Sequence, residues 1–83
     1  MKMLSILVLG PGCYNCHKLE DMCKEVVEEQ GIEAAIAPVT DLDQIHALGV
    51  MMTPGLVING AVVSSGRVPS KSSIEQWIIE AAQ

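Results

Sequence analysis

The first apolar segment runs from Met3 to Leu9 and is hydrophobic at nearly every position. Such a run predicts a strand that is covered on both faces, which places it at the centre of its sheet. The strand is expected to end at Gly10-Pro11-Gly12. From residue 14 to residue 30 the period changes to that of a helix, which Gly31 is placed to end. One face of this helix carries apolar residues: Leu19, Met22, Cys23, Val26 and Val27.

The middle of the chain predicts a strand followed by a short helix. Residues Ile32 to Val39 alternate weakly between apolar and polar positions, as expected for a strand. Pro38 cannot donate a backbone hydrogen bond, which favours a strand at the edge of the sheet. Thr40 or Asp41 can cap a helix that reaches Leu48.

The last third predicts a hairpin and a final helix. Asn59-Gly60 separates apolar strands at 56–58 and 61–64, and this dipeptide is typical of a tight hairpin turn. Either Ser70 or Ser72 can cap the last helix, and the second choice would form a capping box with Glu75. The buried stripe of that helix would be Ile74, Trp77, Ile78 and Ala81.

The element order is therefore βαβ-α-ββ-α within one domain spanning residues 1–83. A right-handed parallel βαβ unit joined to an antiparallel hairpin gives an α/β fold. We expect a four-stranded mixed sheet with helices on both faces.

Composition and charge narrow the function. The chain has 83 residues, 49% of them hydrophobic, with no Phe, so its core is expected to be mostly aliphatic. Ten acidic against five basic residues argue against nucleic acid or an anionic membrane as the partner. The longest apolar run, Met3 to Leu9, is far shorter than a membrane-spanning segment. It is not followed by the small-residue cleavage site of a signal peptide. Three cysteines are too few for a disulfide-stapled secreted scaffold, so we expect a cytoplasmic protein.

The cysteines of the sequence Cys13-Tyr14-Asn15-Cys16 lie where the first strand gives way to the first helix. Neighbouring positions in a first helical turn bring two sulfurs within reach of a disulfide. The helix N-terminus favours a thiolate at Cys13. The dipole alone lowers a thiol pKa by less than about one unit, or about 1.5 units at best. His17, four residues after Cys13, is the nearest candidate for lowering it further, and the pattern predicts thiol–disulfide exchange.

A second element supports this chemistry. Thr53-Pro54 lies just before the third predicted strand, and proline is the one residue for which a cis peptide bond is cheap. A cis Pro54 would present the backbone of Thr53 beside the sulfurs, where it could pair with an extended substrate segment.

Together these residues resemble the thioredoxin/glutaredoxin superfamily, and more narrowly the small archaeal and bacterial thioredoxins called redox-active disulfide protein 2. The resemblance rests on Gly12-Cys13-Tyr14-Asn15-Cys16, on Thr53-Pro54-Gly55-Leu56 and on Gly66-Arg67-Val68-Pro69-Ser70. It implies a thioredoxin-like fold in which Cys13 is the nucleophile, Cys16 the resolving thiol and Pro54 the cis-proline. Tyr14 and Thr53 would help to bind substrate.

The resemblance also implies partners. The substrate would be the disulfide of a partner protein, and electrons would come from a thioredoxin-reductase-type dithiol. We expect a monomer with no bound cofactor. The sequence lacks the acidic residue in the first strand and the Gly-Pro dipeptide between the cysteines that ordinary thioredoxins have.

Metal binding is the alternative function. Cys13 and Cys16 with a third donor, His17 or Cys23, could hold a soft ion such as Cu(I), Zn(II) or As(III). However, small heavy-metal chaperones of this kind end in a strand, whereas this chain is expected to end in a helix. Cys23 lies in the apolar stripe of the first helix, which favours core packing. The Cys-x-x-Cys-His pattern also matches haem attachment, but no haem-sized apolar pocket is evident.

Overall fold

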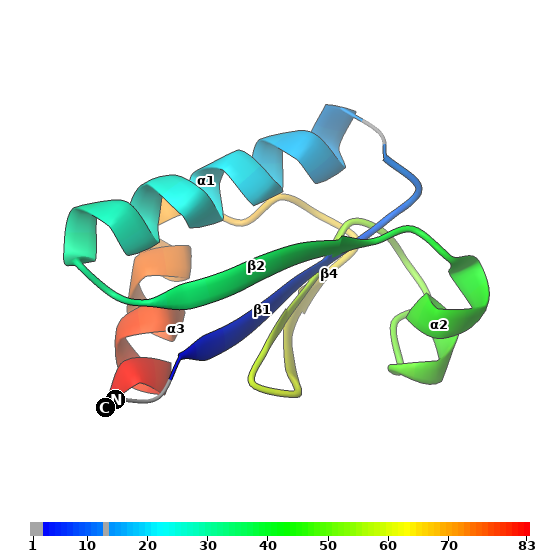
Figure 1. Cartoon of the computed structure of the whole chain (residues 1–83). Coiled ribbons are helices and arrows are strands. Elements are labelled where there is room, and N and C mark those ends of the chain that lie inside the picture. Colours follow the sequence, from blue (N-terminus) through cyan, green and yellow to red (C-terminus); the bar gives the residue numbers. More distant parts are fainter. Residues whose placement is uncertain (1–2, 13) are drawn as a thin grey trace.

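The computed structural model describes residues 3–12 and 14–83. Helices and strands follow one another in the predicted order (Figure 1). Their bounds are β1 (Leu4–Leu9), α1 (Tyr14–Gln30), β2 (Ala34–Val39), α2 (Leu42–Ala47), β3 (Gly55–Ile58), β4 (Ala61–Ser65) and α3 (Lys71–Ala82).

The four strands form one mixed sheet in the order β2-β1-β3-β4. Strand β1 runs parallel to β2, with Leu4 opposite Ala34, and antiparallel to β3, with Ile6 opposite Ile58. The predictions of a central first strand and of an edge position for the strand that contains Pro38 are both confirmed.

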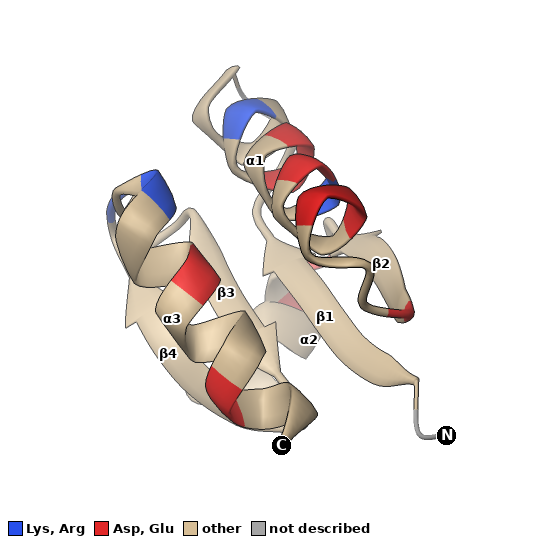
Figure 2. Ribbon diagram, turned by 90° about the vertical axis from the view of Figure 1, so that its left-hand side faces the viewer, with Lys and Arg blue, Asp and Glu red and all other residues tan. Residues whose placement is uncertain are grey.

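Helices cover both faces of the sheet, as predicted. Helices α1 and α3 lie side by side on one face, and α2 lies on the other (Figure 2). Alternate residues of β1 serve the two faces: Ile6 and Val8 pack beneath α1 and α3, whereas Leu9 packs with Ile45 of α2. Helix α2 is only six residues long, and Ser5 at the start of β1 is exposed. The second face is therefore covered mainly at the end where β1 finishes.

Local signals set the ends of most elements. Helix α1 ends at Gln30, and Gly31 follows it with φ +64°, a left-handed conformation that glycine adopts readily. The Asp41 carboxylate caps α2 by accepting a hydrogen bond from the Asp43 backbone N–H at 2.9 Å. Asn59 and Gly60 have φ of 50° and 85° and form the hairpin turn between β3 and β4.

The last helix begins at the earlier of the two predicted serines. Ser70 has an extended backbone, and its Oγ accepts a hydrogen bond from the Ser73 backbone N–H at 3.3 Å. The helix therefore starts at Lys71, which places Ser72 inside the first turn. The prediction of a capping box between Ser72 and Glu75 is therefore wrong, because a residue with helical backbone cannot serve as the N-cap.

Candidate functional site

The first turn of α1 carries the cysteine motif. Cys13 lies outside the described residues. Tyr14 begins the helix with its side chain 77% exposed, whereas Cys16 is buried at 6% exposure. The motif thus combines one buried sulfur with an aromatic ring that projects into solvent.

The sulfur of Cys16 lies directly against the backbone of Gly10, at the end of β1. A Cβ atom at position 10 would overlap Cys16 Sγ and would lie 3.7 Å from Thr53 Cβ. The end of the first strand, the first turn of α1 and the residue before Pro54 therefore meet at one point. Thr53 and Cys16 are 37 positions apart in the chain, and the structure brings them together as the sequence predicted.

The loop before β3 is held in place by the end of β4. The Thr53–Pro54 peptide bond is cis, which confirms that prediction. Pro54 is buried and Thr53 is half-buried. The Gly66 backbone N–H donates to the carbonyl oxygens of Pro54 and Met52, at 2.9 and 3.1 Å. This shared donor fixes the loop on both sides of Thr53.

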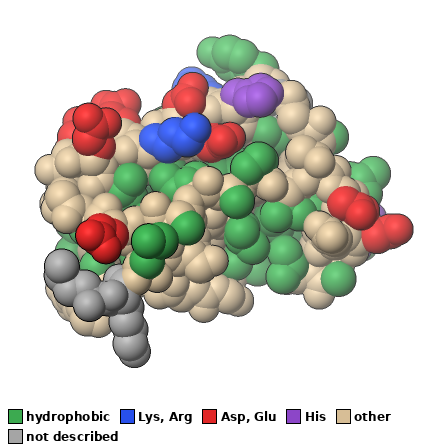
Figure 3. All heavy atoms as spheres, viewed as in Figure 1, with side chains coloured by type: hydrophobic (Ala, Val, Ile, Leu, Met, Phe, Trp, Pro, Cys, Tyr) green, Lys and Arg blue, Asp and Glu red, His purple; other side chains and the backbone are tan. Residues whose placement is uncertain are grey.

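Large apolar side chains remain exposed in the segments that form this site. Met51 is 75% and Met52 67% exposed, comparable to Tyr14. Figure 3 shows exposed hydrophobic side chains beside α2 and charged side chains mostly along α1. Flexible methionines and an aromatic ring are side chains that suit contact with varied protein partners.

The charge on α1 is unevenly distributed. No acidic residue lies in its first turn, and the glutamates and aspartate of the helix begin at Glu20 (Figure 2). Nothing in that turn therefore opposes a negative charge at the helix N-terminus. His17 lies in the same turn and is exposed.

Cys23 belongs to the core, as its place in the apolar stripe predicted. It is completely buried among residues such as Leu19 and Ile78. Burial, and secondarily the negative charge of Glu20, raise the pKa of the Cys23 thiol to about 12. A thiol with that pKa stays protonated at neutral pH, so it is neither a nucleophile nor a ready metal ligand.

The metal-binding alternative requires a third donor beside Cys13 and Cys16, and Cys13 lies outside the described residues. Within residues 3–12 and 14–83, no group of three or more His, Cys, Asp or Glu side chains is placed to hold a metal ion. Cys16 and Cys23 lie seven residues apart on an unbroken helix, a separation of about 10 Å.

Among the residues that the structure describes (3–12 and 14–83), no helix is long and apolar enough to cross a membrane.

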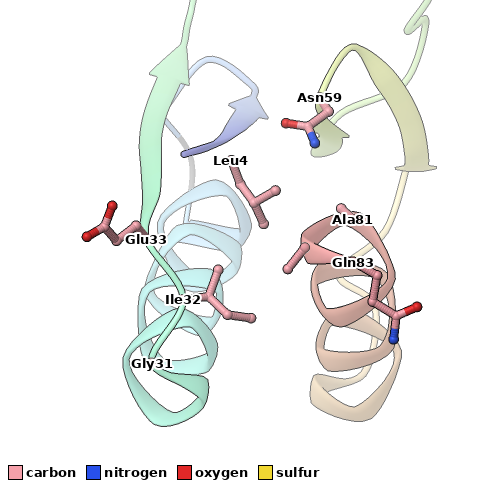
Figure 4. Close-up of a pocket in the computed structure, with 8 residues that line it drawn as sticks. Leu4, Gly31, Ile32, Glu33, Asn59, Ala81 and Gln83 are labelled. Atoms are coloured by element: carbon pink, nitrogen blue, oxygen red, sulfur yellow. The ribbon is translucent and has the colours of Figure 1, made fainter. Parts of the chain in front are cut away.

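A pocket of about 570 Å³ lies between the segment that follows α1 and the end of α3, near the start of β1 (Figure 4). The start of β1 is the opposite end of that strand from Gly10. The lining of the pocket includes Leu4, Ile32, Ala81 and Asn59. The Asn59 side-chain oxygen already accepts a hydrogen bond from the Ser5 backbone N–H at 2.9 Å. The pocket thus lies far from the sulfur chemistry, and this polar group on its wall is already engaged by the backbone of β1.

Gly10 is the residue of the site that sequence reasoning missed. In the sequence, Gly10 is recognisable only as part of the Gly10-Pro11-Gly12 segment that ends the first strand. No local signal marks its contact with Cys16, because that contact depends on how α1 packs across the end of the sheet.

Comparison with known proteins agrees with this geometry. The chain matches the thioredoxin domain family over residues 4–79. It is 39% identical over 74 residues to a thioredoxin of Methanothermobacter thermautotrophicus, covering 89% of this chain and 96% of the relative. A thioredoxin of Methanocaldococcus jannaschii is 38% identical over 74 residues, covering 89% and 85%.

Solved structures share the fold. The oxidised thioredoxin from Plasmodium falciparum superimposes with a TM-score of 0.67 at 16% identity, covering 99% of this chain and 84% of its own. Thioredoxin-2 of the malaria parasite gives the same TM-score at 17% identity, covering 96% and 85%. The predicted thioredoxin-like fold is therefore confirmed, and the chain belongs to the thioredoxin family of thiol–disulfide oxidoreductases.

Proposed function

We propose that this protein reduces disulfides of partner proteins, with Cys13 as the nucleophile and Cys16 as the resolving thiol. The observation that carries the proposal is the meeting of the Cys16 sulfur and Thr53 at Gly10. It supports the proposal because the Cys16 sulfur and Thr53, whose backbone would hold the substrate, both lie against the same glycine.

The exchange proceeds in two balanced steps. The Cys13 thiolate attacks one sulfur of the substrate disulfide. The substrate S–S bond breaks, a mixed disulfide forms, and the released substrate sulfur takes up a proton. Cys16 then loses its proton and attacks the Cys13 sulfur, and the second substrate sulfur leaves and is protonated. The substrate gains two electrons and two protons, and Cys13 and Cys16 end as a disulfide.

A dithiol reductant must restore the pair. The donor would be a reductase of the thioredoxin-reductase type, whose own dithiol becomes a disulfide in the same two steps. All the electrons pass between sulfur atoms, so the protein itself needs no bound cofactor. The exchange fits a monomer acting in the cytoplasm, where thiols are kept reduced.

Substrate recognition would use the loop and side chains around the sulfurs. An extended segment of the substrate would pair with the backbone of Thr53, next to the buried Pro54. Tyr14 and Met52 are largely exposed and would contact its apolar side chains. These contacts are spread over the start of α1 and the loop before β3, an arrangement that suits an extended polypeptide.

The N-terminus of α1 would favour the Cys13 thiolate. A helix terminus contributes about 0.3–1 kcal/mol, so it lowers a thiol pKa by less than about one unit in an exposed site. The absence of acids from the first turn preserves this effect. His17 would add to it when protonated.

Trapping the intermediate tests the proposal. Cys16→Ser should accumulate a mixed disulfide with a protein substrate, seen as a mass shift that dithiothreitol reverses. Cys13→Ser should form no such adduct and should lose reductase activity. Cys23→Ala is the matched control, because Cys23 is the third cysteine and is buried in the core. Full reductase activity in Cys13→Ser would overturn the mechanism.

A further inference from the structure

We propose that Gly10 is a positioning residue that sets where the resolving sulfur of Cys16 sits. The inference rests on the proposed resolving role of Cys16. Its basis is steric, because Cys16 Sγ occupies the space that any side chain at position 10 would need.

The backbone conformation does not account for this glycine. Five of the seven glycines have a positive φ, a conformation that favours glycine wherever it occurs, and Gly10 is not among them. Gly55 is the other exception, and a Cβ there would meet the Val50 side chain at 3.0 Å. At Gly10 the atom in the way is the sulfur itself.

Neither side of this contact is free to retreat. The Gly10 backbone N–H donates to the Val39 carbonyl oxygen at 2.9 Å, which ties the end of β1 to β2. On the other side, α1 is anchored by Leu19 and Val26, both fully buried. A methyl group at position 10 would therefore be accommodated mainly by rotation of the Cys16 side chain, which moves the sulfur.

Moving the sulfur has a specific kinetic consequence. Resolution of the mixed disulfide requires Cys16 Sγ to approach the Cys13 sulfur in line with the bond that breaks, and misplacement of a reacting atom by about 1 Å can cost about a hundredfold in rate. The first attack, by Cys13 on the substrate, does not use Cys16. Gly10→Ala should therefore slow resolution and leave the first attack unchanged.

The kinetic test measures the two steps separately. In the full chain, Gly10→Ala should lower the resolution rate, followed as decay of the mixed disulfide by quenched mass spectrometry, by about tenfold to a hundredfold. The first attack is measured in the Cys16→Ser background, with and without Gly10→Ala, and should be equal in both. Cys23→Ala is the matched control: it removes a buried side chain from the same helix and should leave the resolution rate as in the parent. Equal resolution rates in Gly10→Ala and the parent would overturn the inference.

A double-mutant cycle tests the contact itself, including the case in which Gly10→Ala alone fails to fold. Overpacking at Gly10 should lower the folding equilibrium constant by about tenfold to a hundredfold. In the Cys16→Ala background the nearest atom is the Cβ at position 16, 3.4 Å away, so most of this loss should disappear. A loss of the same size without the sulfur would refute the contact. If the parent chain shows no disulfide exchange at all, the proposed function fails, and the outcome of this cycle is independent of it.

Discussion

The buried thiol of Cys23 should make the stability of the fold sensitive to alkaline pH. Its pKa is raised from 9.0 in the unfolded chain to about 12 in the native state, chiefly by burial and secondarily by Glu20. Between these values the unfolded state releases a proton that the folded state retains. Stability contributed by this thiol is therefore fully present below pH 9 and is lost as the pH rises toward 12.

The magnitude follows from the two pKa values. Each pH unit in this window is worth about 1.4 kcal/mol for one group, so the loss approaches about 3 kcal/mol at pH 11 and is negligible at pH 8. The pKa of Lys71 is raised by its hydrogen bonds to Glu25 and Glu29, so above the ordinary pKa of 10.5 the unfolded chain loses a proton that the folded protein keeps, and the stability contributed by Lys71 also begins to fall. Both groups thus act in the same direction, and only a comparison of variants separates them.

Urea unfolding of the parent and of Cys23→Ala, measured from pH 7 to pH 11, isolates the thiol. Cys23→Ala should be less stable than the parent at pH 7, because it leaves a small cavity in the core. Its free energy of unfolding should fall less steeply above pH 9, so the difference between the two proteins shrinks by about 2 to 3 kcal/mol by pH 11. Lys71 is present in both proteins and cancels. Parallel pH profiles would show that the folded protein ionises Cys23 as easily as the unfolded chain does.

Three further predictions concern other contacts. Lys71→Met removes ion pairs of 2.7 and 3.0 Å to two glutamates of α1 and should lower Tm. A decrease in Tm that is as large in 1 M NaCl as in low salt would contradict an ionic origin. Asn59→Ala should lower the free energy of unfolding, measured in urea, by about 2 to 3 kcal/mol, because the protein loses both a residue that tolerates the left-handed turn conformation and the acceptor for the Ser5 N–H. Asn59→Gly should restore only the contribution of the turn conformation. Tyr14→Ser should raise KM for a protein disulfide by about fivefold to tenfold, with little effect on KM for a small aromatic disulfide. The free energy of unfolding should change by less than about 0.5 kcal/mol. Equal effects on both substrates would rule out a docking role.

Local patterns predicted much of this fold because the physical signals involved are themselves local. The helical period gave the bounds of α1 correctly, and the stripe that includes Leu19 and Val26 is buried as expected. Asn59-Gly60 forms the predicted turn because both residues tolerate positive φ.

Features that depend on packing between distant segments were out of reach of the same reasoning. Ser70 and Ser72 both satisfy the local requirements for an N-cap of the last helix. In the structure α3 begins at Lys71, so the N-cap is Ser70. The contact of Gly10 with Cys16 joins the end of a strand to a helix that crosses it, and the sequence of neither segment indicates that the two are in contact. The ion pairs of Lys71 with α1 likewise appear only when α3 lies beside α1.

Helix α1 shows how one element combines structural and redox roles. Its acids are concentrated toward the C-terminal end, where the helix dipole makes negative charge unfavourable, and no basic residue lies in its last turn. Lys71 of α3 offsets this by pairing with Glu25 and Glu29. The first turn is left without acids, so the positive end of the dipole remains available to a thiolate. The two described cysteines of the helix divide in the same way: Cys23 is held neutral in the core, and Cys16 lies at the end of the sheet against a residue that has no side chain.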